Sequence, residues 1–340
     1  MTMFIWNPLT AGKAALASLY AFSTWRSSSS PSIHLTLKPN FNASQHIISL
    51  SAVLVIQDTY RANAGEVLLE MTTTVGNVPS NDYSGANALK ATDDNGILPL
   101  TFNDADNGMR YWYSSRATHG RITAEFEALP RQLDDHTPVG PRVDLRMDQG
   151  GLIGAGYTFI PVPPNRDTIF NIHLNWNLSG APEGTTAAWS FGDGIMSNKS
   201  GTVDVLTKTT YMVGPIIKYT SNITPRYGMS KDFGVYWFGS PKAFDIQSCA
   251  RDLEKLFGKM ALFFEDKDES YRIFLRFNPY RGYGGTGFSR SFVLEYDPYV
   301  VIDEDDLLFL FTHEMVHNWP LLEQLSDGHS EEGSWYSEGM

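Results

Sequence analysis

The segment IDEDDLLFLFTHEMVHNW, residues 302–319, predicts a helix that carries metal-binding side chains near its end. Its acidic residues crowd the first turn, where the helix dipole favours negative charge. His313 and His317 are four residues apart, so on a helix they share one face and can bind one ion. Glu314 is placed to reach a water molecule on that ion. The spacing H-E-x-x-H therefore predicts a zinc hydrolase site.

An amphipathic helix with two incidental histidines is the alternative interpretation. The chain has 8 histidines in 340 residues, so the motif arises by chance in roughly one such chain in a hundred. A zinc hydrolase also needs a third protein ligand. Downstream of the helix, residues 333–340 read GSWYSEGM and place Glu338 near the end of the sequence.

The two motifs together, H-E-x-x-H-x-W and then W-x-S-E-G, resemble the gluzincin metallopeptidases and most closely the glycyl aminopeptidase family. The resemblance implies that His313, His317 and Glu338 bind Zn²⁺ and that Glu314 is the general base. Trp319 and Trp335 match the aromatic positions of the family. His329 is a conceivable substitute ligand, although its polar surroundings favour a solvated loop.

Residues 281–290, RGYGGTGFSR, formally match a G-x-G-x-x-G fingerprint, but a strand pattern follows where a dinucleotide site needs a helix. The residues by themselves predict a hairpin turn. The segment also resembles the substrate-binding edge strand of the family, G-G-L-E-H-x-x-S. The resemblance implies that Gly284, Gly285 and Thr286 bind substrate.

That edge strand departs from the family at one important position. Gly287 stands where the gluzincin aminopeptidases have a glutamate that recognises the free amino group of the substrate. We therefore expect weak discrimination for a free N-terminus. Glu295 would compensate only if the strand folded back, which we do not expect.

The first two thirds of the chain predict an all-β domain. Ile33, Leu35 and Leu37 alternate within SIHLTLKP, and five further strand-like runs, broken by turn sequences, follow before residue 205. After about residue 209, helical and strand patterns mix. We predict an N-terminal tail (1–31), a β-sandwich-like domain (32–205) and the N-terminal part of an α+β thermolysin-like catalytic domain (206–340).

Composition excludes several other classes. The net charge of −12 argues against nucleic-acid binding, and no apolar run is long enough for a transmembrane segment. Cys249, the single cysteine, lies in an amphipathic helical pattern and is expected to be inert. The expected partner is a peptide or protein substrate. The compartment is left open, with the cytoplasm slightly favoured over secretion, and the oligomeric state is undetermined.

The predicted function is zinc-dependent hydrolysis of peptide bonds. Family members continue beyond S-E-G with a helical domain, so the resemblance implies that the catalytic domain is truncated here. The alternative is a truncated or inactive relative whose β-domain binds other proteins. The sequence decides neither between these two readings nor between exo- and endopeptidase.

Overall fold

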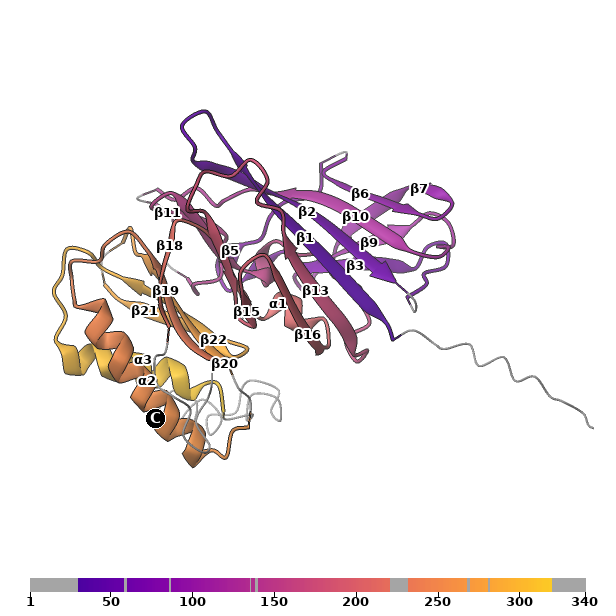
Figure 1. Cartoon of the computed structure of the whole chain (residues 1–340). Coiled ribbons are helices and arrows are strands. Elements are labelled where there is room, and N and C mark those ends of the chain that lie inside the picture. Colours follow the sequence, from indigo (N-terminus) through magenta and orange to yellow (C-terminus); the bar gives the residue numbers. More distant parts are fainter. Residues whose placement is uncertain are drawn as a thin grey trace, which may run out of the picture.

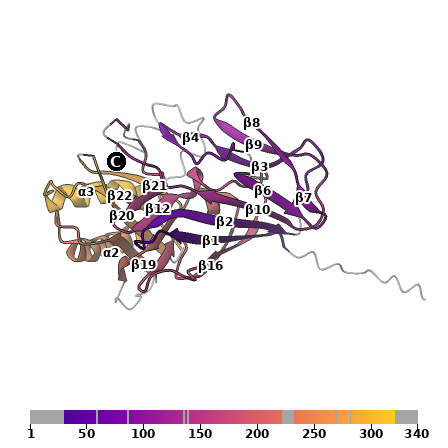
Figure 2. The same ribbon diagram turned by 90° about the horizontal axis from the view of Figure 1, so that it is seen from above.

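The computed structural model describes residues 30–57, 60–85, 87–134, 136–137, 140–220, 232–267, 270–280 and 282–319. Within these residues the molecule is strand-rich, as predicted, and its main elements stack in four layers: the three larger of its five β-sheets and a layer of helices (Figure 1). The helices lie at one end of the molecule and strand β7 at the other (Figure 2). Each pair of neighbouring layers encloses an apolar cluster.

The first layer is a seven-stranded sheet in the order β16-β13-β1-β2-β10-β6-β7. Strand β1 runs parallel to β13 and antiparallel to β2. Ile33, Leu35 and Leu37 of β1 are fully buried on one face, which confirms the alternation predicted from the sequence. The strands are β1 (Ser32–Phe41), β2 (Ile47–Gln57), β6 (Leu89–Asp93), β7 (Gly96–Leu98), β10 (Ile122–Ala128), β13 (Phe170–Trp176) and β16 (Met196–Gly201).

The second layer is a five-stranded sheet in the order β11-β12-β17-β14-β15. Its strands are β11 (Arg146–Asp148), β12 (Gly151–Ala155), β14 (Thr186–Trp189), β15 (Gly192–Asp193) and β17 (Thr210–Gly214). Smaller elements flank it: β3 (Val67–Thr72), β8 (Leu100–Asp104), β9 (Met109–Ser114), β4 (Thr74–Val75), β5 (Val78–Pro79), the 3-10 turn η1 (Gly156–Thr158) and the short helix α1 (Asp204–Thr207).

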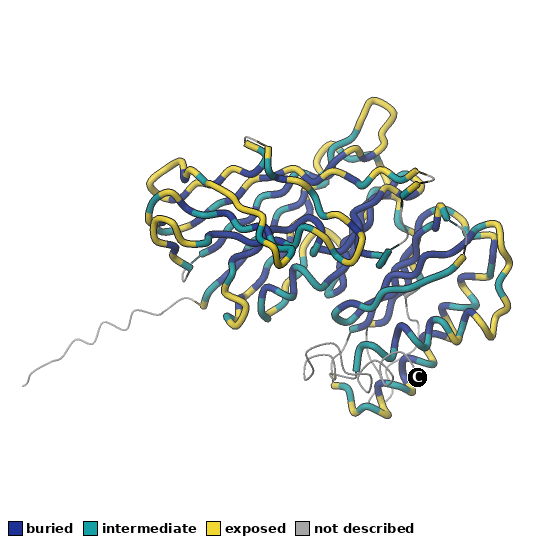
Figure 3. Tube along the Cα trace, turned by 180° about the vertical axis from the view of Figure 1, so that it is seen from behind, coloured by how far each residue is buried: buried dark blue, intermediate teal, exposed yellow. Residues whose placement is uncertain are grey.

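The second sheet is apolar on both faces because it has a layer on each side. In β17, Tyr211 and Val213 join the core shared with the first sheet, whereas Met212 joins the core shared with the third. Buried residues run in continuous stretches through the middle of the molecule, and exposed ones gather on its outer surface (Figure 3). A sheet with two covered faces is expected to have nearly continuous apolar strands.

The third layer is a five-stranded sheet in the order β18-β19-β20-β22-β21, with β21 at one edge. Its strands are β18 (Ile216–Thr220), β19 (Asp232–Phe238), β20 (Ser270–Phe277), β21 (Gly284–Phe288) and β22 (Ser291–Tyr296). Helices α2 (Ile246–Phe263) and α3 (Glu304–Val316) cover the face that points away from the second sheet (Figure 1).

The structure corrects two local expectations. The glycine-rich segment is not the turn of the hairpin: it forms strand β21, and the turn follows at Ser289 and Arg290. The chain does fold back, contrary to our expectation, and places Glu295 of β22 opposite Gly284 of β21. Glycine is scarce in ordinary strands, so the sequence pattern alone suggested a turn at this point.

The division into domains at residue 205 stays a prediction. Strand pairing joins β17 to β12 and β14, and the next strand, β18, pairs with β19 of the third sheet. None of the helices in the described part of the chain combines the length and apolar character that crossing a bilayer requires.

Candidate metal centre

Helix α3 brings the residues of the H-E-x-x-H motif against the third sheet. Asp303 caps the helix by accepting a hydrogen bond from the backbone N–H of Asp305 at 2.9 Å. Leu307, Phe311 and Met315 recur every four residues and are buried in the cluster under the sheet. This apolar face fixes the rotation of the helix and therefore the direction of the side chains between them.

The two histidines converge at the end of α3. His317 is the C-cap residue, and its Nε2 atom lies 3.3 Å from Nε2 of His313, with the two rings almost perpendicular at 89°. Two imidazole nitrogens on one tetrahedral zinc, each 2.0–2.1 Å from the ion, are about 3.4 Å apart. The observed separation therefore fits two ligands of one zinc ion.

Glu314 is buried between helix α3 and strand β21, with only 7% of its surface exposed. A Cβ atom added at Gly285 would overlap the carboxyl group of Glu314, and one added at Gly287 would lie 3.2 Å from Cβ of His317. Glycine at both positions lets the strand approach the helix at the motif. The structure thus brings Gly285 and Gly287 together with the residues of the motif.

The third predicted ligand, Glu338, lies outside the described residues, as do His329 and Trp335. Within the part of the chain that is described, no group of three or more potential metal-binding side chains comes together. The predicted set of His313, His317 and Glu338 is therefore seen only for its two histidines.

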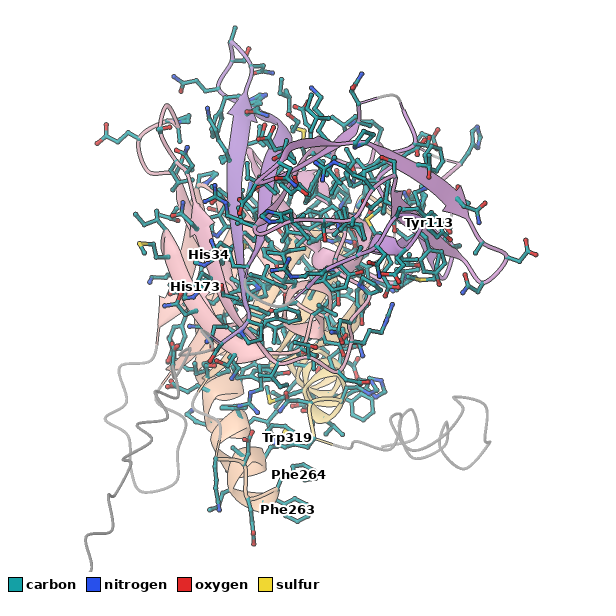
Figure 4. The ribbon with its side chains drawn as sticks, turned by 90° about the vertical axis from the view of Figure 1, so that its right-hand side faces the viewer. His34, Tyr113, His173, Phe263, Phe264 and Trp319 are labelled. Atoms are coloured by element: carbon teal, nitrogen blue, oxygen red, sulfur yellow. The ribbon has the colours of Figure 1, made fainter. Side chains whose placement is uncertain are left out.

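Trp319 ties the end of the motif helix to the body of the molecule. Its indole N–H donates a hydrogen bond to Asp266 at 2.8 Å. Its ring stacks on Phe264 at 5.1 Å (Figure 4) and on Tyr271 at 6.3 Å. Trp319 lies two residues beyond His317. These contacts therefore hold the chain just where it leaves the candidate ligand.

The opposite face of β21 meets the N-terminal half of the chain. The backbone N–H of Arg142 donates to Oγ1 of Thr286 at 2.8 Å, and the Arg142 guanidinium occupies the space where Gly284 lacks a side chain. Strand β21 therefore lies between α3 on one face and Arg142 on the other. Successive residues of β21 face opposite sides of the sheet, as the pleat of a strand requires.

Glu295 belongs to an ionic cluster on this second face. It is paired with Arg146 at 2.6 Å, with Arg276 at 2.8 Å and with Arg142 at 3.4 Å. Arg276 is 1% exposed and also binds Asp144. Burial raises the pKa of Asp148. Burial also acts to raise the pKa of Asp144, but Arg276, Arg146 and Arg131 together outweigh it and the pKa is lowered. Glu295 is thus committed to arginines.

Two other features lie outside the candidate centre. Cys249 is half-buried on α2, and burial, together with Asp252 and Glu304, raises its pKa to about 12. A thiol of this kind is a poor nucleophile at neutral pH. His34 and His173 form a second histidine pair on neighbouring strands, but their rings stack face to face at 4.4 Å (Figure 4). This pair offers a matched control for the first.

Sequence reasoning missed Arg142, Arg146 and Arg276. Arg142 is separated from Thr286, its contact on β21, by 144 positions in the sequence. No local pattern around Arg142 marks it, because its position depends on how the second and third sheets pack. The only available signal was the run of glycines in β21, which indicates a close approach to the backbone.

No family model and no curated protein matches the sequence. A solved aminopeptidase N family protein from Idiomarina loihiensis has a TM-score of 0.63 and 18% identity, over 90% of this chain and 52% of that one. An M1 zinc metallopeptidase from Deinococcus radiodurans has a TM-score of 0.48 and 15% identity, over 84% and 63%.

The chain thus spans about half the length of the first protein and less than two thirds of the second. The likeness to the first concerns the fold and extends over nine tenths of this chain. The chain has a fold similar to that of an aminopeptidase N family protein.

Proposed function

We propose that this chain carries the metal centre of a zinc peptidase and hydrolyses peptide bonds with Glu314 as general base. The observation that carries the proposal is the 3.3 Å separation of the two histidine Nε2 atoms beside a buried glutamate. The similarity of fold to an aminopeptidase N family protein supports the same conclusion. The similarity covers only part of that protein, so activity and substrate are proposals for this chain.

His313 and His317 would hold the zinc through their Nε2 atoms, with Glu338 as the third ligand that the sequence predicts. An ion bound there supplies Lewis-acid chemistry, since it lowers the pKa of a water molecule to about 7 and polarises a carbonyl group. The residues of the chain then determine where the substrate lies and where the proton goes.

Glu314 would accept the proton of the attacking water. As the new C–O bond forms and the C–N bond breaks, Glu314 returns that proton to the leaving amine nitrogen. Its burial against Gly285 limits the directions in which the carboxylate can turn. A fixed carboxylate of this kind serves a general base well, because little reorganisation is needed during the reaction.

Strand β21 would hold the substrate. It is the edge strand of the third sheet and includes Gly284, Gly285 and Thr286, of which Gly285 lies against Glu314. An extended peptide can pair with such an edge through main-chain hydrogen bonds, as an added strand.

Elemental analysis and peptide hydrolysis test the proposal together. We expect about one zinc per full-length chain and hydrolysis of unstructured peptides. The substitution His317→Ala should remove both, because two remaining ligands do not hold the ion. His173→Ala, in the stacked pair, is the matched control and should retain zinc and activity. Equal zinc contents in the His317→Ala variant and the parent chain would contradict the assignment.

A further inference from the structure

Arg142 lies on the face of β21 opposite the metal motif, and most of its hydrogen-bond donors have no acceptor among the described residues. A guanidinium has five N–H donors. In the described part of the chain, the Arg142 guanidinium makes one hydrogen bond, from Nη1 to the carbonyl of Gly140 at 3.4 Å. Its Nε is buried and finds no hydrogen-bond acceptor among the described residues, although Glu295 lies 3.4 Å away.

The ionic cluster around Arg142 has more cations than carboxylates. Among the described residues, four arginines face three carboxylates: Arg131, Arg142, Arg146 and Arg276 against Asp144, Asp148 and Glu295. Burial and the charge of Arg276 lower the pKa of Arg146, as expected where positive charge is in excess. A half-buried site with surplus positive charge and unused donors favours an anion.

The pleat of β21 places this site beside a bound peptide. In paired strands, residues opposite each other direct their side chains to the same face. Peptide side chains opposite Gly285 and Gly287 would therefore point toward α3 and the metal motif. A side chain opposite Gly284 would point toward Arg142, whose guanidinium fills the space above that glycine.

We propose that Arg142 selects peptides that carry a carboxylate near the residue paired with Gly284. The carboxylate belongs to an acidic side chain or to the C-terminus of the peptide. It would bind the Nη1 and Nη2 edge of the guanidinium, the geometry in which arginine recognises carboxylates, while Glu295 stays on the Nε side. This inference rests on the proposed function, since it assumes that β21 holds the substrate.

The test compares four kinds of peptide, all of one length. The first kind is a series with an amidated C-terminus, in which each peptide carries a single glutamate at a different position. The second has glutamine at the same positions. The third has only neutral side chains and a free C-terminus. The fourth has only neutral side chains and an amidated C-terminus. Dissociation constants are measured by calorimetry on the zinc-loaded Glu314→Gln chain, and kcat/KM on the parent chain.

We expect the best carboxylate peptide to bind about tenfold or more tightly than its amide counterpart. The glutamate series and the free C-terminus separate the two sources of the carboxylate. In Arg142→Gln the ratio should fall to near one. Arg142→Lys, which keeps the charge but loses the two-pronged geometry, should give an intermediate ratio. Arg166→Gln, which removes the ion pair with Glu70, is the control and should leave the ratio unchanged.

A ratio near one in the parent chain, or an unchanged ratio in both Arg142 variants, would overturn the inference. The two proposals fail differently. Hydrolysis of all four kinds of peptide at equal rates would refute the role of Arg142 but not the peptidase activity. The opposite result is a carboxylate preference in binding without hydrolysis of any peptide by the zinc-loaded parent chain. It would refute the peptidase activity but not the carboxylate-binding site.

Discussion

The two faces of strand β21 are built in different ways. On one face, Gly285 and Gly287 contact helix α3, where the functional side chains come from five consecutive positions. On the other, Gly284 and Thr286 contact Arg142, which the packing of distant sheets brings into place. The first face depends on helical periodicity and the second on tertiary structure. We therefore expect changes on the first to affect chemistry and changes on the second to affect substrate choice.

Glu314→Gln should produce the largest effect on the helical face. The amide has nearly the same shape but cannot accept a proton, so kcat should fall by about 10²–10⁴. The zinc content should stay at its parental level, because Glu314 is not a predicted ligand. Turnover close to that of the parent chain would show that another group serves as the base. Loss of zinc would show that Glu314 binds the ion.

Gly285→Ala and Gly284→Ala compare the two faces at neighbouring positions. The new methyl group at 285 overlaps the Glu314 carboxyl group, and displacing a base by about 1 Å can cost a factor of about 10² in rate. The methyl group at 284 overlaps the Arg142 guanidinium, which lies at the end of a flexible side chain. We expect the first variant to lower kcat and the second mainly to raise KM for acidic peptides.

Steady-state kinetics separate these effects. Gly85→Ala is a suitable control, because a Cβ atom at that position lies in ordinary contact, 3.7 Å from Ala88. The comparison of faces would fail if both strand variants lowered kcat by the same factor with KM unchanged.

The smallest effect is expected for the N-terminus of the substrate. Gly287 has no side chain to pair with a free amino group, and Glu295 lies on the other face, bound to arginines. Matched peptides with free and acetylated N-termini should therefore differ by less than about tenfold in kcat/KM. A preference of about a hundredfold for the free amine, nearly 3 kcal/mol of transition-state binding, would mean that another carboxylate recognises it.

The contrast between the faces also explains what the sequence could predict. The spacing of His313, Glu314 and His317 predicted their common side of a helix, because helical geometry is local. Alternation in residues 33–37 likewise predicted a half-buried strand. The glycines of GGTGF predicted a turn rather than a strand. In β21 these glycines instead allow another element to approach the backbone closely.

Local sequence patterns could not predict the ionic cluster. Glu295 meets Arg276 across neighbouring strands and Arg146 across two sheets. Such contacts follow from the register and from the packing of layers, and no spacing along the chain encodes them. The role of the metal is a proposal that His317→Ala tests, and the role of Glu338 stays a prediction.

The layered order of the sheets has a consequence for how the protein is made. A ribosome releases the first two sheets, which end at Gly214, well before the last strand of the third, which ends at Tyr296. At a synthesis rate of roughly 5–20 residues per second, the outer apolar face of the second sheet stays exposed for about 4–16 s until the third sheet has been synthesised. Nascent chains stalled after Gly214 has left the ribosome, but before the third sheet is complete, should therefore bind chaperones or hydrophobic dyes, and chains stalled well beyond residue 296 should not.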